Sequence, residues 1–240
     1  MLKKIIKKII FPHTYSSAAY IKYLRRKGIS IGNNCYVWSP NRTLIDIQRP
    51  EMLYIGDYCK ITEGVTILVH DYSTSVTRRK FHEHIGNAAK TIIGDNVFIG
   101  MNSIILMGTK IGDNCIVGAG SIVSGTYPNN VVIAGNPAKI ICSIDKYWER
   151  KKDNVLDSAL NLYYSYKKRK GRIPSIEEMG NAYAWLYLPR TQETISKYSR
   201  FFCLSGDNKE EVIRDFLKSE GMFNSFEDFC CYADGEERYE

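Results

Sequence analysis

His70 is the side chain of this sequence whose position points most directly to chemistry. It stands, followed by Asp71, where a regular sequence pattern stops and a polar, basic segment containing His82 and His84 begins. An imidazole titrates close to neutral pH, so it can act as a general base toward a weak nucleophile such as a hydroxyl. Such a base needs an acceptor on its second ring nitrogen. Asp71, Glu63 and a main-chain carbonyl are the open alternatives for that acceptor.

The pattern around this histidine has a period of six residues. Branched aliphatic side chains recur at every sixth position after the polar segment: Ile93, Ile99, Ile105, Ile111, Val117 and Val123. This period fits neither a strand nor a helix, and it is typical of a hexapeptide β-solenoid whose aliphatic residues stack inside the coil. A looser form of the pattern precedes the histidine, at Ile31, Ile55, Ile61 and Ile67. We predict a β-solenoid over residues 29–143, interrupted by a loop at about 70–91 that carries functional groups.

Other chemically active residue types recur at single corner positions of the repeat. Asp57, Asp95 and Asp113 share one such position, and Cys35, Cys59 and Cys115 share another. A repeated position favours a structural role, so we expect corner hydrogen bonding from the aspartates and packing from the cysteines. The cysteines lack the spacing of a zinc site, and no metal is expected.

Two segments flank the predicted solenoid. Residues 1–28 combine lysine and isoleucine pairs with a helix that Ser16 or Ser17 can cap and Gly28 can end. The apolar stretches there are too short to span a bilayer, so the segment docks on its own domain or a neighbouring subunit, or lies on an anionic membrane surface. Residues 144–240 are too aromatic for disorder and predict a helical extension, with a helix start at Pro174-Ser175.

The formal net charge of +7 is unevenly distributed. Residues 146–172 are basic and residues 207–240 acidic, so the two ends of the extension are expected to attract each other or neighbouring subunits. No motif indicates nucleic-acid binding. The seven cysteines and the lack of a secretory signal indicate the reducing cytoplasm, with peripheral contact at the inner face of the membrane as an option for the basic N-terminal segment.

Residues 31–141 resemble the hexapeptide-repeat acyltransferases, in particular the galactoside, maltose, Nod-factor and polysaccharide O-acetyltransferases. Three segments carry the resemblance: 93–102 (IGDNVFIGMN), 111–123 (IGDNCIVGAGSIV) and 128–141 (PNNVVIAGNPAKII). The resemblance implies a mainly β fold, a left-handed parallel β-helix, to which the flanking segments add the helices expected at both ends. It also implies a homotrimer with active sites between adjacent chains and acetyl-CoA as the acyl donor.

The same resemblance assigns roles to individual residues. The histidine of the interrupting loop, in a His-Asp context, is the general base, which places His70 in that role. Asp71, Asn41 and Glu51 fall near the acceptor, although the repeat is irregular around the last two. Lys139 stands where an arginine is common, and Phe98 where a tryptophan is common. The residues at donor-contacting positions are Met101, Ala119, Ser124, Gly125 and Lys139.

We therefore expect an O-acetyltransferase that acts on a sugar hydroxyl in surface-polysaccharide modification. One alternative keeps the reaction but changes the acceptor to serine, an amino sugar or an antibiotic. Another is a non-catalytic β-helix scaffold. A metal hydratase resembling the γ-class carbonic anhydrases needs three suitably placed histidines, and His70, His82 and His84 lack the coil spacing.

Overall fold

The computed structural model describes residues 8, 10–204 and 206–236. Contacts between residues divide the chain into two compact units, Met1–Tyr147 and Trp148–Glu240. Among the described residues, no helix is long and apolar enough to cross a bilayer.

The expected N-terminal helix is α2, Ser17–Arg26. The Ser16 hydroxyl accepts a hydrogen bond from the Ala19 amide at the start of α2, and Gly28 follows its end with a φ of 101°. Most of the amphipathic segment 1–11 lies outside the described residues, so the predictions made for it have no structural test.

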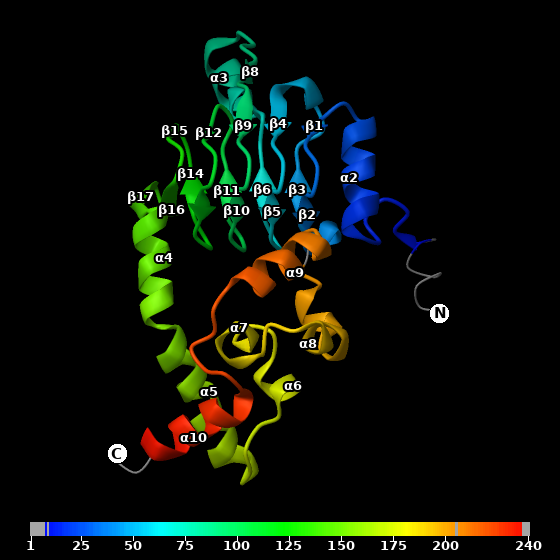
Figure 1. Ribbon diagram of the computed structural model, residues 1–240. Helices are drawn as coiled ribbons and strands as arrows, with labels where there is room; N and C mark the ends of the chain where they lie inside the picture. Colours follow the sequence, from blue (N-terminus) through cyan, green and yellow to red (C-terminus); the bar gives the residue numbers. More distant parts are fainter. Residues whose placement is uncertain (1–7, 9, 205, 237–240) are drawn as a thin grey trace. The chain divides into compact units, whose positions relative to one another are not determined.

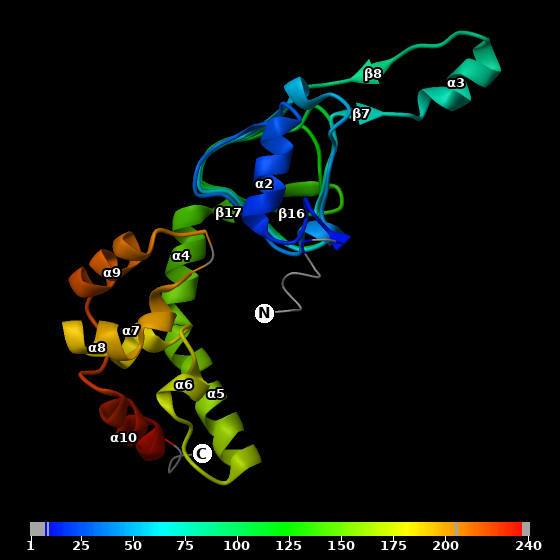
Figure 2. The same cartoon turned by 90° about the vertical axis from the view of Figure 1, so that its right-hand side faces the viewer.

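The first unit is a left-handed parallel β-helix, as predicted, in which short strands form three sheets around one axis (Figures 1 and 2). The first sheet contains β1 (Ser30–Ile31), β4 (Leu53–Ile55), β9 (Thr91–Ile93), β12 (Lys110–Ile111) and β15 (Thr126–Tyr127). The second contains β2 (Tyr36–Val37), β5 (Lys60–Ile61), β10 (Phe98–Ile99), β13 (Ile116–Val117), β16 (Val131–Gly135) and the antiparallel β17 (Ala138–Ser143). The third contains β3 (Leu44–Ile45), β6 (Thr66–Ile67), β11 (Ile104–Ile105) and β14 (Ile122–Val123).

The predicted six-residue pattern is the core of this unit. All six aliphatic residues from Ile93 to Val123 are buried, and residues one coil apart pair in register, as Ile99 does with Ile61 and Val117. Burial of such side chains is the main stabilising contribution of each coil. Val37, which stands six residues after Ile31, belongs to the same core, and so does Ile45, which the pattern missed because it stands eight residues after Val37.

The three sheets meet at three corners, which we name by chain order. The first corner joins the first sheet to the second, the second corner joins the second to the third, and the third corner joins the third sheet to the first strand of the next coil. In the first coil, η1 (Pro40–Arg42) lengthens the second corner and η2 (Pro50–Met52) lengthens the third. These insertions break the period of six near the start of the chain.

The interruption after Val69 is an arm, residues 70–88. The strand β7 (His70–Asp71) pairs antiparallel with β8 (Asn87–Ala88), and α3 (Thr74–Phe81) lies between them. Figure 2 shows the arm projecting from the β-helix at the third corner. The predicted insertion is therefore a strand pair with a helix at its outer end.

The second unit is helical, so a mainly β description fits residues 29–143 only. The helices are α4 (Ile144–Asp153), which crosses the boundary between the units, α5 (Val155–Lys170), α6 (Ile176–Met179), α7 (Ala184–Tyr187), α8 (Gln192–Lys197), η3 (Ser199–Phe202), α9 (Lys209–Lys218) and α10 (Phe226–Glu236). Large aromatic side chains fill its core: Tyr163, Tyr187, Phe202, Phe216 and Phe229.

Two local predictions for this unit are confirmed. The Ser175 hydroxyl accepts a hydrogen bond from the Glu178 amide, and the Glu178 carboxylate accepts one from the Ser175 amide, which is a capping box at the start of α6. The basic and acidic ends of the extension also meet, because Lys167 Nζ lies 2.9 Å from Asp234 Oδ1.

Candidate active site

His70 begins the arm at the third corner, and its ring is held by a carboxylate from the first coil. His70 Nδ1 hydrogen-bonds to Asp46 Oδ2. The Asp46 side chain is only 4% exposed, whereas that of His70 is 22% exposed. The histidine is therefore partly open to solvent, while the carboxylate behind it is sealed in.

Asp46 also accepts hydrogen bonds from two backbone amides. The Gln48 amide lies 3.0 Å from Oδ1 and the Val69 amide 3.1 Å from Oδ2. Burial alone would raise the pKa of Asp46, but these two amides and His70 together hold it below its ordinary value. The carboxylate is therefore ionised near neutral pH and accepts a hydrogen bond from the protonated Nδ1 of His70. This tautomer leaves the lone pair of Nε2 free to accept a proton.

Asp46 was missed in the sequence, although a signal for it exists. It directly follows Ile45, the last residue of β3, just as Leu68 follows Ile67 one coil later in the paired strand β6. The η1 insertion places Ile45 eight positions after Val37 instead of six, which obscures the register. Aligning strands across the insertion would have placed Asp46 at the third corner beside His70.

The two side chains proposed to orient His70 have other partners. Both Asp71 oxygens accept hydrogen bonds from Ser73, one from its amide (2.7 Å) and one from its hydroxyl (2.6 Å), at the approach to α3. These hydrogen bonds lower the pKa of Asp71. Glu63 lies at the second corner, where it forms an ion pair with Arg42 and accepts a hydrogen bond from the Ser39 hydroxyl at 2.6 Å. Asp46, which was not among the alternatives left open by the sequence, therefore takes the place considered for Asp71, Glu63 or a main-chain carbonyl.

The residues assigned to the donor lie along both edges of the third sheet. Ser124 and Gly125 follow β14 at the third corner, on the same edge as His70. Met101 and Ala119 lie at the second corner, on the opposite edge, and all four are exposed. Two coils separate β6, next to His70, from β14, which corresponds to about 10 Å along the axis.

The remaining donor and acceptor assignments are more scattered. Lys139 lies on β17, exposed, opposite Ala134 of β16. Glu51 is exposed in η2 at the third corner, on the edge that carries His70. Asn41 lies in η1 at the second corner and lines a cavity of about 440 Å³ against α2, so the structure does not bring it to the histidine's corner.

The outer end of the arm carries the other two histidines. His82 follows the last residue of α3, and both His82 and His84 are exposed. Among the described residues, no three His, Cys, Asp or Glu side chains gather closely enough to hold a metal.

The repeated aspartates form a hydrogen-bonded ladder at the first corner. The Asp57 amide donates to Asp95 Oδ1 (2.8 Å), and the Asp95 amide donates to Asp113 Oδ1 (2.8 Å). A β-carbon at Gly94 would overlap the Asp113 carboxylate, so glycine is required there. The corner role expected for these aspartates is what the structure shows.

Comparison with known proteins relates the chain to a family. A family model described as the hexapeptide repeat of succinyl-transferase matches residues 90–124. Protein CapG of Staphylococcus aureus is 43% identical over 145 residues, which are 60% of this chain and 83% of CapG. A tetrahydropyridine-dicarboxylate N-acetyltransferase of Clostridium perfringens is 50% identical over 66 residues, 28% of each chain. This chain thus spans most of CapG but little of that N-acetyltransferase.

Solved structures show related proteins. A maltose O-acetyltransferase from Clostridium difficile 630 is 27% identical with a TM-score of 0.43, over 52% of this chain and 75% of that one. Galactoside acetyltransferase in complex with coenzyme A is 26% identical with a TM-score of 0.43, over 63% of this chain and 82% of that one. The extent and identity of the match to CapG, together with the hexapeptide model, decide the assignment. The chain belongs to the hexapeptide-repeat acyltransferase family.

Proposed function

We propose that this protein transfers an acetyl group from acetyl-CoA to a sugar hydroxyl, with His70 as the general base. The observation that carries the proposal is the pairing of His70 with the buried, ionised Asp46 at the third corner. Family membership supports acyl transfer. The sugar hydroxyl as acceptor follows from the resemblance of residues 31–141 to the galactoside, maltose and polysaccharide O-acetyltransferases.

In the proposed reaction each group takes one step in the path of the proton. Bound acetyl-CoA supplies an acetyl thioester, whose carbonyl carbon is open to attack by an oxygen. His70 Nε2 removes the proton of the acceptor hydroxyl as the new ester bond forms and the thioester bond breaks. His70 then returns the proton to the departing thiolate, so the histidine ends as it began. Asp46 holds the ring throughout and stabilises its transient positive charge.

Two exposed side chains of the β-helix fit a nucleotide thioester: Ser124, which follows β14 of the third sheet, and Lys139 on β17 of the second sheet. The Ser124 hydroxyl and the Lys139 ammonium are exposed, and no other described residue holds them. Lys139 provides a positive charge for a phosphate, without the two-pronged geometry of arginine. The Met101 carbonyl accepts a hydrogen bond from the Gly120 amide, and the Gly125 carbonyl accepts one from the Lys110 amide, both at 2.8 Å. These two carbonyls therefore already take part in the hydrogen bonds between coils.

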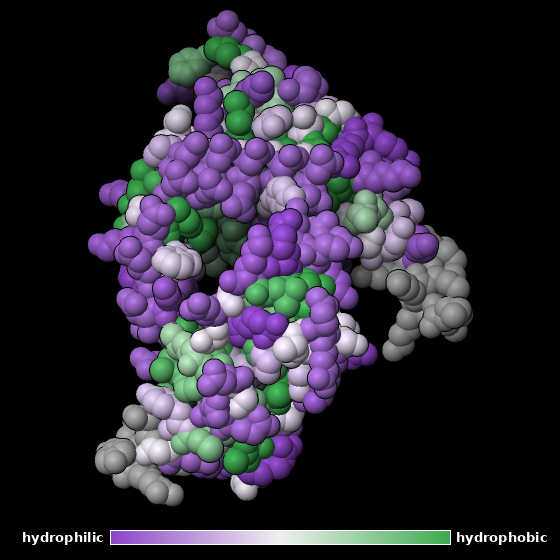
Figure 3. Space-filling model, viewed as in Figure 1, coloured by the Kyte–Doolittle hydropathy of each residue, from purple (hydrophilic) through white to green (hydrophobic). Residues whose placement is uncertain are grey.

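The proposal includes a homotrimer, in which the arm of one chain contacts the next. The support is the exposure of large apolar side chains on the arm: Tyr72, Val76, Phe81 and Ile85 are each more than half exposed. Figure 3 shows hydrophobic side chains at the top of the view, in the region of α3 and β8. Apolar groups gathered on a projecting element are typical of a surface that another chain covers. Analytical ultracentrifugation of the wild type and of Phe81→Ser tests this assembly. We expect the wild type to sediment as a trimer and the variant to dissociate more readily.

We place the enzyme in the cytoplasm, acting on glycans for surface polysaccharide. All seven cysteines are free in the structure, which is consistent with a reducing compartment.

Release of free thiol from acetyl-CoA tests the function. The acceptors are a panel of sugars, nucleotide sugars, amino sugars and serine, and the variants are His70→Ala and, as a matched control on the arm, His82→Ala. We expect release that depends on a sugar acceptor, falls about 10²–10⁴-fold in His70→Ala and persists in His82→Ala. Undiminished release in His70→Ala would refute the assignment of the base. Release with serine or an amino sugar alone would show that the acceptor is that compound and not a sugar hydroxyl. Absence of both release and coenzyme A binding would indicate a scaffold.

A further inference from the structure

The end of α5 in the helical unit concentrates positive charge. Lys167, Lys168, Arg169 and Lys170 form its last turn, and Arg172 follows immediately after the Gly171 cap. Gly171 has a φ of 69°, and this left-handed conformation turns the chain back so that Arg172 returns beside Tyr166 of the same helix.

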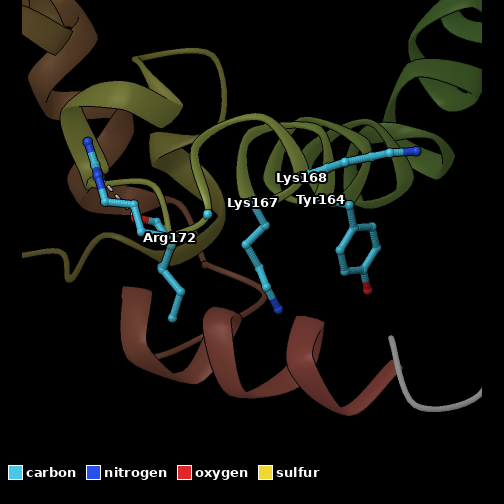
Figure 4. A pocket seen from close by; sticks show the side chains of 6 residues that line it. Tyr164, Lys167, Lys168 and Arg172 are labelled. Carbon is cyan, nitrogen blue, oxygen red and sulfur yellow. Dashed lines mark hydrogen bonds between the residues drawn. The ribbon is translucent and has the colours of Figure 1, made fainter.

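Two of these cations are fixed by carboxylates of the same unit. Lys167 pairs with Asp234 of α10 at 2.9 Å, and Figure 4 shows its side chain extending toward α10. The Arg172 guanidinium donates two hydrogen bonds to Glu178, at 2.8 and 3.0 Å. Those bonds from Arg172, together with hydrogen bonds from the Ser175 amide and the Tyr166 hydroxyl, lower the pKa of Glu178 to about 2. These two ion pairs fix the orientations of the Lys167 and Arg172 side chains near the C-terminus of α5.

The other three cations have no such partner among the residues that the structure describes. Within the described parts of the chain, no carboxylate forms an ion pair with Lys168, Arg169 or Lys170. The cluster therefore keeps an excess of positive charge. The carbonyls at a helix C-terminus attract cations, but that attraction is weak and largely screened at an exposed position.

A cavity of about 600 Å³ adjoins this charge. It is lined by Tyr164, Lys167, Lys168, Gly171, Arg172 and Ile173, with no carboxylate among the lining residues (Figure 4). A phosphoryl group brings up to two negative charges and three acceptor oxygens, and lysine and arginine together are its usual ligands. Lys167 and Arg172 are each held by one carboxylate, so Lys168 is the lining residue whose charge is left for such a group, with Arg169 and Lys170 next to it in the sequence.

We propose that this cavity binds the phosphoryl group of a phosphate ester. The ester is either a soluble diphosphate ester or the headgroup of an anionic phospholipid, since both present anionic phosphate oxygens to lysine and arginine side chains. The site belongs wholly to the helical unit and does not depend on the acyl-transfer proposal.

Two binding measurements on the full-length protein separate these sources. Calorimetry with inorganic pyrophosphate tests the soluble ester. Co-sedimentation with phosphatidylcholine vesicles, with and without phosphatidylglycerol, tests the headgroup. Binding of pyrophosphate without binding to anionic vesicles assigns a soluble ester. Binding to anionic vesicles that is reversed by added pyrophosphate assigns the headgroup.

The decisive variant is Lys168→Gln/Arg169→Gln/Lys170→Gln, which spares the two fixed ion pairs. Its control, Lys197→Gln/Lys209→Gln/Lys218→Gln, removes the same charge from exposed lysines elsewhere in the unit. We expect about tenfold weaker binding in the first variant and near wild-type binding in the control. Equal weakening in both variants would reduce the effect to net charge and overturn the proposal. The absence of binding to both probes would also overturn it, and the cations would then have only their weak interaction with the C-terminal carbonyls of α5.

Discussion

The two units of this protein build their cores in opposite ways. The β-helix stacks small aliphatic side chains in columns, so that Ile61, Ile99 and Val117 each contact a similar residue in the coils above and below. The helical unit instead packs a few large rings from different helices, with the centroids of Phe202 and Phe216 4.9 Å apart and those of Tyr187 and Phe229 5.3 Å apart.

This difference has a consequence for where function can reside. A stack of repeated coils offers fixed positions at every corner, and an insertion at one corner can hold a side chain without disturbing the core. His70 and Asp46 use that arrangement at the third corner. The aromatic core of the helical unit has no repeated positions, and each large ring there carries a larger share of the stability.

The largest expected effect comes from the carboxylate behind the base. In Asp46→Asn the amide can donate to His70 Nδ1, which favours the tautomer whose Nε2 is protonated and unable to accept a proton. We expect the rate of thiol release to fall about 10²–10⁴-fold. The measurement is kcat together with coenzyme A affinity, which should stay near that of the wild type.

Asp57→Asn is the matched control for this variant. It makes the same chemical change at the first corner, away from the third corner that carries the base. The asparagine keeps a side-chain oxygen that can accept the hydrogen bond from the Asn33 amide. A wild-type rate in Asp46→Asn, or an equal loss in both variants, would contradict the positioning role of Asp46.

A smaller effect distinguishes the two cores. Phe216 is fully buried and contacts Phe202, Trp185 and the Arg190 guanidinium, whose centre lies 4.6 Å from the ring centroid. Phe216→Ala should lower the free energy of unfolding of the helical unit by about 3–5 kcal/mol. In the buried column of the β-helix, Ile99→Val should cost only about 0.5–1.5 kcal/mol.

Urea unfolding followed by circular dichroism measures both changes. Phe216→Ala should displace the transition of the helical unit and leave thiol release at the β-helix intact. Loss of both units in a single step at the same urea concentration would show that the two cores are not independent.

The smallest effect concerns the thiols. The Cys59 thiol, one coil away, hydrogen-bonds to Cys35 and lowers its pKa, whereas burial raises the pKa of Cys230 in the helical unit to about 11. Because a thiol reacts as its thiolate, alkylation of Cys35 should begin at lower pH than that of Cys230. Peptide mass spectrometry after iodoacetamide treatment across a pH series gives both profiles. If alkylation of Cys35 and Cys230 followed the same pH dependence, their surroundings would not shift the pKa values of the two thiols as described.

The β-helix could be predicted largely because its core repeats in sequence. The aliphatic core residues from Ile93 to Val123 and the corner role of Asp57, Asp95 and Asp113 both follow from fixed spacing. The same dependence on spacing explains what was missed. The insertions η1 and η2 shift Ile45 and Asp46 out of register, so the partner of His70 was sought in Asp71 and Glu63 instead.

The helical unit could be predicted only piece by piece. Local signals identified the helix start at Pro174-Ser175 and the attraction between the basic and acidic ends of the unit, because each depends on neighbouring residues or on net charge. Its core depends on contacts between distant segments, such as Tyr163 with Phe229, and no periodicity records those contacts.

The most direct test of the account is to detect the acetyl ester itself. The wild type and His70→Asn are each incubated with acetyl-CoA labelled with ¹³C in the acetyl group and with a sugar acceptor identified by thiol release, and the products are read by NMR. We predict an ester carbonyl signal on the sugar in the wild type and none in His70→Asn, with equal affinity of both for coenzyme A. An ester formed at the wild-type rate by His70→Asn would contradict the central claim that His70, held by Asp46, is the base.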